Sequence, residues 1–159
     1  KDRGGSIQVL VSGETNGAPS VLSNNVLSAF KSYMNQVKVA GVILDVKSLA
    51  ADGVRIQADV QVDPQIITTD GVRISDGTKA VEDAINGYLA NIIYGGTFNK
   101  TKLVDAIQNV EGVVDVTLGK VEVKPSGSTS YTEMTSNNYS AVSGCFKSDK
   151  LNETIVYVV

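Results

Sequence analysis

Few residues of this chain could do chemistry, because its 159 residues include no His and only one Cys. Histidine is the commonest general base and the commonest metal ligand, so its absence excludes a Ser-His-Asp triad and Cys-His catalysis. A single Cys cannot form an internal disulfide or a Cys-rich zinc site. Cys145 has only Lys147 as a basic neighbour, so we interpret it as a small structural side chain rather than a nucleophile.

Carboxylates are the remaining groups that could bind a metal ion or catalyse hydrolysis. Four aspartates follow one another within a short stretch: Asp59, Asp63, Asp70 and Asp76. Their spacing matches no EF-hand loop, and we expect solvated side chains rather than a metal site. The adjacent pair Glu82-Asp83 falls on the polar side of a predicted helix, which argues against glycoside hydrolysis by paired carboxylates. The sequence therefore predicts no catalytic residue, no metal site and no cofactor.

Phosphate-binding glycine motifs are also missing from the sequence, which contains neither G-x-x-x-x-G-K-[ST] nor G-x-G-x-x-G. Gly95-Gly96 precedes a predicted helix and could cradle an anion. We favour a helix end followed by a turn, which is the usual role of such glycines. The balance of 14 Lys+Arg against 17 Asp+Glu does not favour nucleic acid as a partner. No run of about 20 apolar residues predicts a membrane partner either.

Aromatic and methionine side chains on a polar segment are the best candidates for a binding role. Residues 126–140 consist mostly of Ser, Thr, Asn and Gly, and they carry Tyr131, Met134 and Tyr139. Side chains of these types often anchor a partner protein, so the three residues form the predicted partner interface. The alternative is that they fold back and cap the protein's own core. The sequence leaves both interpretations open.

The elements that would position these residues follow from hydrophobic periodicity and from capping or turn residues. Strict alternation of Val54, Ile56, Ala58, Val60 and Val62 with polar residues predicts a half-buried strand. The other predicted elements are a strand at 7–11, a loop at 13–20, a helix from Ser23 or Asn24 to 37, a strand at 42–49, a helix from Asp76 or Thr78 to 93, a helix capped by Asn99, a strand at 114–123 and a final strand at 155–159.

The order of these elements predicts an α+β fold. We expect a ferredoxin-like split βαβ two-layer sandwich with an extra helix and a C-terminal arm ending in a strand. In this fold the strands at 42–49 and 54–62 form a hairpin at Asp52-Gly53. The apolar stripe of the first helix then faces the core. The expected domains are a ferredoxin-like domain at 1–125 and a polar arm with the closing strand at 126–159.

The pattern as a whole resembles the C-terminal part of baseplate J-like proteins, which are structural proteins of contractile phage tails. The segments that carry the resemblance are residues 5–11, Ala18-Pro19, residues 39–42, the helix ending in Tyr88-Leu89, residues 103–107 and residues 110–116. The resemblance extends over about residues 4–119. The resemblance implies a non-enzymatic structural subunit with no catalytic residues, made in the bacterial cytoplasm and located in the virion at the tail baseplate. Its partners would be other baseplate or tail subunits, with a second copy of the chain as a further option.

The sequence also leaves two other functions open. A small-molecule-binding regulatory module could use the same scaffold, because this kind of fold hosts many functions. A cell-surface adhesion module is favoured only by the Ser/Thr/Asn-rich segment, and it would need a signal segment upstream. Since residue 1 is Lys, we expect the chain to be a piece of a longer or processed protein.

Overall fold

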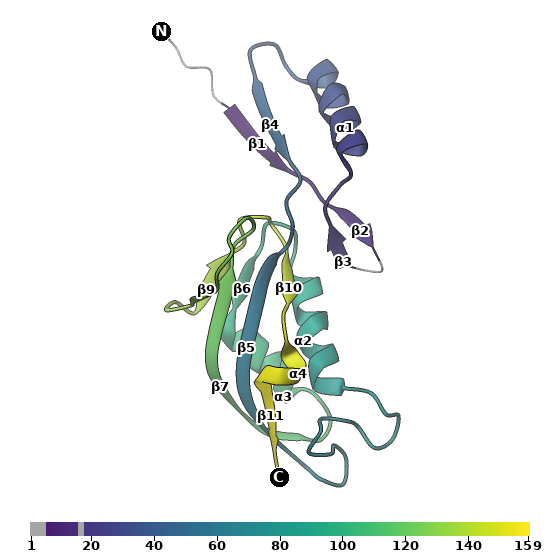
Figure 1. Ribbon diagram of the computed structural model, residues 1–159, viewed down its shortest axis with the longest axis vertical. Coiled ribbons are helices and arrows are strands. Elements are labelled where there is room, and N and C mark those ends of the chain that lie inside the picture. The colour runs from purple at the N-terminus through teal and green to yellow at the C-terminus, as the bar shows by residue number, and fades with distance from the viewer. Residues whose placement is uncertain (1–5, 16–17) are drawn as a thin grey trace.

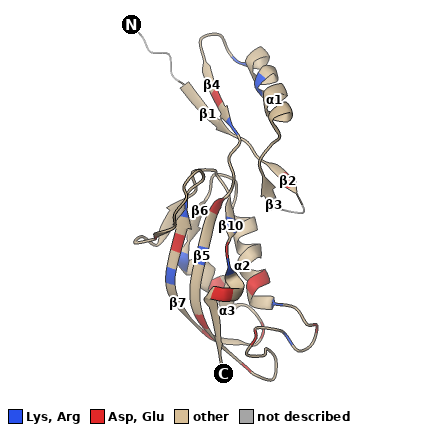
Figure 2. Cartoon of the chain, viewed as in Figure 1, with Lys and Arg blue, Asp and Glu red and all other residues tan. Residues whose placement is uncertain are grey.

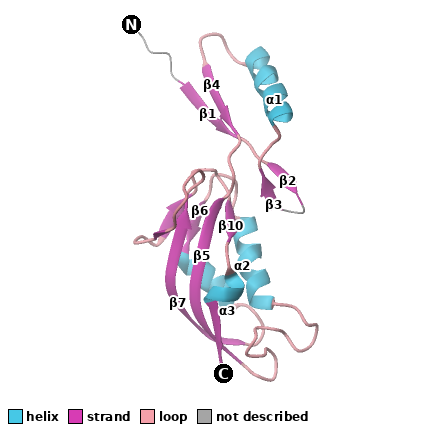
Figure 3. Ribbon diagram, viewed as in Figure 1, coloured by secondary structure: helices cyan, strands magenta, loops and turns pink. Residues whose placement is uncertain are grey.

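The computed structural model describes residues 6–15 and 18–159 (Figures 1 and 3). Residues 4–5 of the resemblance and residues 16–17 of the expected loop lie outside these ranges. The strands are β1 (Ser6–Leu10), β2 (Gly13–Thr15), β3 (Ala18–Ser20), β4 (Ile43–Lys47), β5 (Asp52–Val62), β6 (Thr97–Asn99), β7 (Val113–Lys124), β8 (Thr132–Glu133), β9 (Asn138–Ser140), β10 (Phe146–Ser148) and β11 (Ile155–Val158). The helices are α1 (Asn24–Val37), α2 (Ala80–Asn91), α3 (Lys100–Gln108) and α4 (Leu151–Thr154).

The largest sheet is built around β5, which has partners on both edges. β7 runs antiparallel along one edge, and β8 continues the sheet beyond β7. β10 and then β11 run parallel along the other edge, so the predicted final strand is hydrogen-bonded to the sheet. The predicted alternation of β5 is confirmed, because its five alternating apolar side chains are all buried.

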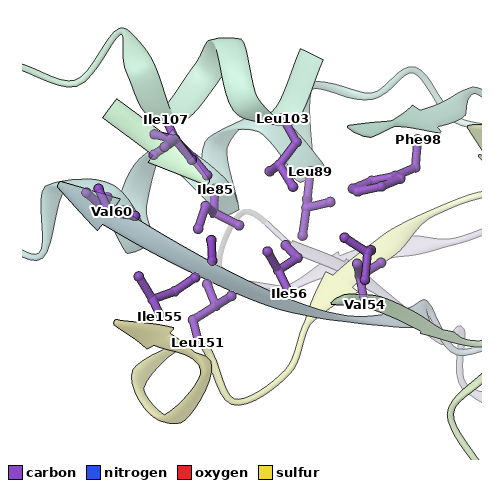
Figure 4. Packing of buried hydrophobic residues seen from close by; sticks show 14 of the residues in the cluster. Val54, Ile56, Val60, Ile85, Leu89, Phe98, Leu103, Ile107, Leu151 and Ile155 are labelled. Carbon is purple, nitrogen blue, oxygen red and sulfur yellow. The ribbon is translucent and has the colours of Figure 1, made fainter. Parts of the chain in front are cut away.

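The helices α2 and α3 cover one face of this sheet, and the core lies between them and β5 (Figure 4). Figure 4 shows Ile85 and Leu89 of α2 beside Leu103 of α3, above the strand that carries Ile56. Asn99 caps α3 as predicted, since its side chain accepts a hydrogen bond from the Lys102 amide. The apolar stripes of both helices therefore supply the second layer of the core.

The beginning of α2 differs from the prediction. The helix starts at Ala80 after Lys79, without a side-chain cap, rather than at Asp76 or Thr78. The Asp76 carboxylate instead accepts hydrogen bonds from the amide and the hydroxyl of Thr78. The side chains that were expected to cap the helix are therefore bonded to each other in a turn that precedes it. Asp and Thr side chains often form such local hydrogen bonds.

Residues 6–47 form a second, smaller unit. β1 and β4 pair in parallel, α1 connects them, and β2 and β3 form an antiparallel hairpin where a loop was predicted. Figure 1 shows this unit projecting beyond one end of the β5 sheet. Ser23 caps α1 as predicted, but the prediction that the α1 stripe faces a core is only partly correct. None of its residues is buried, although Leu27, Phe30 and Met34 are half-buried.

The predicted hairpin at Asp52-Gly53 is wrong. β4 pairs with β1, and Asp52 is the first residue of the long strand β5. Both edges of β5 are occupied by other strands, β7 on one side and β10 with β11 on the other, and the Asp52 amide donates to the Cys145 carbonyl where β10 begins. The α+β class is confirmed, but the described residues form several sheets instead of one four-stranded sheet.

Candidate functional site

The predicted interface residues Met134 and Tyr139 lie against the protein's own core. Met134 is 6% exposed and belongs to the core cluster, and its amide donates to the Val121 carbonyl at 2.8 Å. The ring of Tyr139 packs edge-on against Phe146, with 6.2 Å between the ring centroids. This placement matches the alternative in which these side chains cap the core. An interface role for them stays a prediction.

A buried carboxylate lies at the inner end of the Tyr139 side chain. Asp52 is fully buried, and its oxygens accept four hydrogen bonds. The Tyr139 hydroxyl donates at 2.7 Å, and the backbone amides of Val142, Ser143 and Ser126 donate at 2.9, 3.1 and 3.1 Å. These four donors replace the water that an exposed carboxylate would bind, which makes its burial tolerable. We call this cluster the Asp52 clasp.

The Asp52 clasp holds together segments that are distant in the sequence. The Asp52 amide donates to the Cys145 carbonyl at 3.0 Å and to the Ser143 hydroxyl at 3.1 Å. Burial raises the pKa of the Tyr139 hydroxyl, and its hydrogen bond to Asp52 raises the pKa further. The hydroxyl therefore remains a proton donor to the carboxylate at neutral pH. The sequence does not reveal this cluster, because Asp52-Gly53 has the composition of a turn.

The third predicted interface residue, Tyr131, belongs to a neighbouring polar cluster. Its hydroxyl donates to Asp149 at 2.8 Å, and the Arg55 guanidinium donates to the same carboxylate oxygen at 2.9 Å. The guanidinium also stacks 4.1 Å from the centroid of the Tyr131 ring, as in other cation–π pairs. Tyr131 therefore links β5 to the loop before α4.

Hydrogen bonds and burial in this cluster shift the pKa values of Asp149 and Tyr131 in opposite directions. Hydrogen bonds from Tyr131 and Arg55 lower the pKa of Asp149. Burial, followed by the hydrogen bond to Asp149, raises the pKa of Tyr131 to about 12. The carboxylate is thus stabilised in its charged form, and the phenol remains neutral.

Gly53 explains how Tyr131 comes so close to β5. A Cβ atom at this position would lie 2.6 Å from the Tyr131 hydroxyl oxygen, which is closer than real Cβ contacts. The glycine is therefore required by the neighbouring side chain and not by a hairpin turn.

An open hollow of about 340 Å³ lies beside these clusters. Val123, Met134 and Tyr139 supply apolar lining, while Glu133, Ser136 and Asn138 supply polar groups. The exposed parts of Met134 and Tyr139 thus lie in a shallow depression, which Tyr131 does not line. Its mixture of apolar and polar lining suits a side chain of a partner protein or a small molecule.

The other candidates from the sequence occupy ordinary surface or turn positions. Glu82 pairs with Lys79 at 2.8 Å on α2. Gly95 has a φ of 79° and donates to the Gly144 carbonyl, which is consistent with the predicted turn. Cys145 is buried, and its burial raises its thiol pKa. Within residues 6–15 and 18–159, no group of three or more His, Cys, Asp or Glu could hold a metal ion.

None of the helices in the described part of the chain has the length and apolar character needed to cross a membrane.

Part of the chain is similar to a known protein family. The family model described as Baseplate J-like protein C-terminal domain matches residues 60–124. The matched segment begins within β5, includes α2 and α3, and ends with the last residue of β7. This segment is therefore similar to a baseplate J-like C-terminal domain, which confirms the predicted resemblance for residues 60–124. No curated protein matches the chain.

Proposed function

We propose that this protein is a non-enzymatic structural subunit, or a part of one, in the baseplate of a contractile phage tail or prophage. It acts by binding neighbouring subunits. The observation that carries the proposal is the match of residues 60–124 to the C-terminal domain of baseplate J-like proteins. The tail baseplate is the proposed location, and synthesis takes place in the bacterial cytoplasm.

The architecture supports this proposal through the contrast between a well-buried core and open surfaces. The matched segment contains most of the core, including Ile85, Leu103 and Ile107, which are all fully buried. Around this centre, the described chain leaves several surfaces uncovered, including the free edge of β1 and the hollow beside Met134. A well-packed core that carries open strand edges and hollows suits a subunit whose role is to hold neighbours at defined positions.

The test is the behaviour of the native protein in its source bacterium. Resident prophages are induced, tail-like particles are pelleted and sheared, and the pellet and soluble extract are blotted with an antibody against this chain. Enrichment with the particles supports the proposal, and a band larger than 16.7 kDa would show that the chain belongs to a longer protein. A wholly soluble band of 16.7 kDa that does not respond to induction overturns it.

A small-molecule-binding regulatory module is the second candidate. Two open hollows support it: the one beside Met134 and Tyr139, and another of about 350 Å³ lined by Tyr88, Ile92 and Lys102. A ligand that binds only the native state raises the melting temperature. A metabolite and metal screen by thermal shift therefore tests this candidate, and a screen without any shift counts against it.

A further inference from the structure

β11 carries apolar side chains on both of its faces. Its residues are Ile155, Val156, Tyr157 and Val158. Ile155 and Tyr157 lie in or against the core, whereas Val156 and Val158 are 54% and 46% exposed on the opposite face of the sheet. Strands that run parallel to a neighbour and are buried on both faces have such continuous apolar sequences, and β11 runs parallel to β5. The composition of β11 is thus that of a strand covered on both faces, although its outer face is open in the single chain.

The same face of the sheet is hollowed beside β11. α2 and α3 lie on the other face (Figure 1), and the polar residues of β5 alternate with its buried apolar residues and point outward. Two shallow hollows of about 340 and 290 Å³ adjoin here, since both are lined by Asp59 and Thr117. Val156 lines the first hollow, and Val158 and Asp115 line the second. We call the two hollows together the Asp59 trough.

The charges on this face are separated along the strands. Arg55, Lys120 and Lys124 are the only cations of β5 and β7, and all three lie toward the end at which β5 begins (Figure 2). Arg55 and Lys120 pair with carboxylates there. Asp59 and Asp115 lie toward the other end, and neither of them forms an ion pair with a described residue. The Asp59 trough is therefore anionic and lacks a counter-charge within the described part of the chain.

The two aspartates are close enough to bind one cationic group together. Asp59 is in register with Thr117, which lies two residues after Asp115 on β7. Such diagonal neighbours on adjacent strands lie about 7–8 Å apart, within reach of one long side chain. A guanidinium carries five N–H donors and can therefore bind both carboxylates. Glu153 also lines the trough, but it already pairs with Lys150 at 2.8 Å.

We propose that the Asp59 trough binds a helix of a different, neighbouring subunit, and that this helix carries an apolar stripe with an arginine or lysine beside it. A helix is about 10 Å wide, which corresponds to two spacings of about 4.8 Å between strands. A helix that lies along β5 therefore reaches β11 on one side and β7 on the other. Its apolar stripe covers Val156 and Val158, and its cationic side chain lies between Asp59 and Asp115. The sheet then has helices on both faces, which is a common arrangement of layers.

A metal ion does not account for this surface. A hard cation takes six or more oxygen ligands, and in residues 6–15 and 18–159 no group of three or more acidic side chains could hold one. A metal ion would also leave Val156 and Val158 exposed. A helix with both apolar and cationic side chains accounts for the valines and the aspartates at once. This inference rests on the proposed function and deepens it, because it names one binding surface and the chemistry of the neighbour that binds there.

The first test measures the binding of a synthetic helical peptide to the purified chain. The probe has about 18 residues, because shorter isolated helices are marginal in water, and it carries a leucine stripe flanked by arginines. A peptide with glutamate in place of arginine is its control. We expect the arginine peptide to bind at least about tenfold more tightly, and to lose affinity as the salt concentration rises. Equal binding of the two peptides, or no binding of the arginine peptide, overturns the proposal.

Variants of the chain locate the surface that the arginine peptide binds. Asp59→Asn combined with Asp115→Asn removes both charges of the trough and should weaken binding by about tenfold or more. Val156→Thr, which introduces a hydroxyl on the apolar side, should also weaken it. Asp83→Asn combined with Asp105→Asn is the matched control, because it removes the same charge from exposed positions of α2 and α3, and binding should stay unchanged. Equal weakening by the two double variants, or by neither, contradicts the proposal.

The second test identifies the occupant in tail particles. The photo-crosslinking residue p-benzoylphenylalanine replaces Gln57 at one end of the trough, or Asp105 on α3 as the control, and cross-linked peptides are sequenced by mass spectrometry. We expect position 57 to cross-link to a different protein, at a segment in which apolar residues at helical spacing flank an arginine or lysine. A cross-link to a second copy of this chain, to a segment without a basic residue, or to nothing overturns the proposal. Particles that lack the chain altogether contradict the proposed function instead, and the peptide measurements then decide this inference.

Discussion

β5 has strands along both edges and helices over one face, whereas β1 has a strand along one edge and an exposed Ile7. Both strands carry alternating apolar side chains. The apolar residues of β5 are nevertheless buried, while Val46 is the only buried hydrophobic residue that the structure describes in the unit of residues 6–47. An apolar pattern therefore shows which side chains can be buried, and the neighbouring elements determine whether they are.

The difference in burial implies a difference in stability. Full burial of a Val, Leu or Ile side chain contributes roughly 1.5–3 kcal/mol. Residues 52–159 contain many such side chains, and the smaller unit contains almost none in the single chain. We therefore expect the smaller unit to unfold before the β5 sheet unless a partner covers it.

Truncation should give the largest effect. Removing residues 126–159 deletes β10 and β11, uncovers one edge of β5 and deprives Asp52 of its donors. We expect loss of cooperative folding, measured by circular dichroism during heating. A chain that begins at residue 48 should still melt cooperatively. The two truncated chains also test the domain boundary predicted at residue 125. A cooperative melt of residues 1–125 would contradict the expected loss of folding and would support that boundary.

Asp52→Asn should have the next largest effect. The amide nitrogen of Asn cannot accept a hydrogen bond, so buried donors such as the Val142 amide or the Tyr139 hydroxyl lose their acceptor. We expect a loss of about 3 kcal/mol in the free energy of unfolding, measured by urea denaturation. Asp59→Asn, at an exposed position of the same strand, is the control and should change stability by less than about 0.5 kcal/mol. Equal losses in the two variants would show that the clasp is not a stabilising feature.

Met134→Ala sharpens the comparison between the two regions. Met134 is 6% exposed and lies in the core cluster, so truncation to alanine should destabilise the protein by about 2 kcal/mol. Val37→Ala, at a position that is 56% exposed on α1, should change stability by about 0.5 kcal/mol or less. Urea denaturation of both variants provides the measurement. An unchanged stability in Met134→Ala, together with a loss of binding to tail particles, would instead favour the predicted interface role.

Asp149→Asn should have the smallest effect, and the effect should depend on pH. The folded-state pKa of Asp149 is lowered below its ordinary value of 3.8, so its stabilising contribution is present above that value and is lost as the pH falls through the folded pKa. The side chain is 37% exposed, so the contribution should not exceed about 1 kcal/mol near neutral pH.

Urea denaturation of the native chain and Asp149→Asn at pH 7 and below pH 3 measures this dependence. The two proteins should become equally stable at the lower pH. A difference that persists or grows on acidification would show that Asp149 does not act through its charge.

The sequence by itself determined the elements whose cause is local. Strict alternation defined the buried face of β5, and the Asn99 side chain defined the start of α3. The apolar stripe of α2 likewise predicted the residues that cover the sheet, such as Ile85. These features depend on backbone periodicity and on hydrogen bonds within a few residues, which the order of residues specifies directly.

Only the tertiary structure decided which strands are neighbours and what the polar residues bind. Periodicity shows which face of a strand is apolar, but it does not show which strand lies along its edge. β4 therefore pairs with β1 instead of forming the predicted hairpin with β5. Asp52 illustrates the same limit, because its donors lie 74 to 91 residues further along the chain. The surroundings of such a carboxylate exist only after the chain has folded, since they are assembled from segments that the sequence keeps far apart.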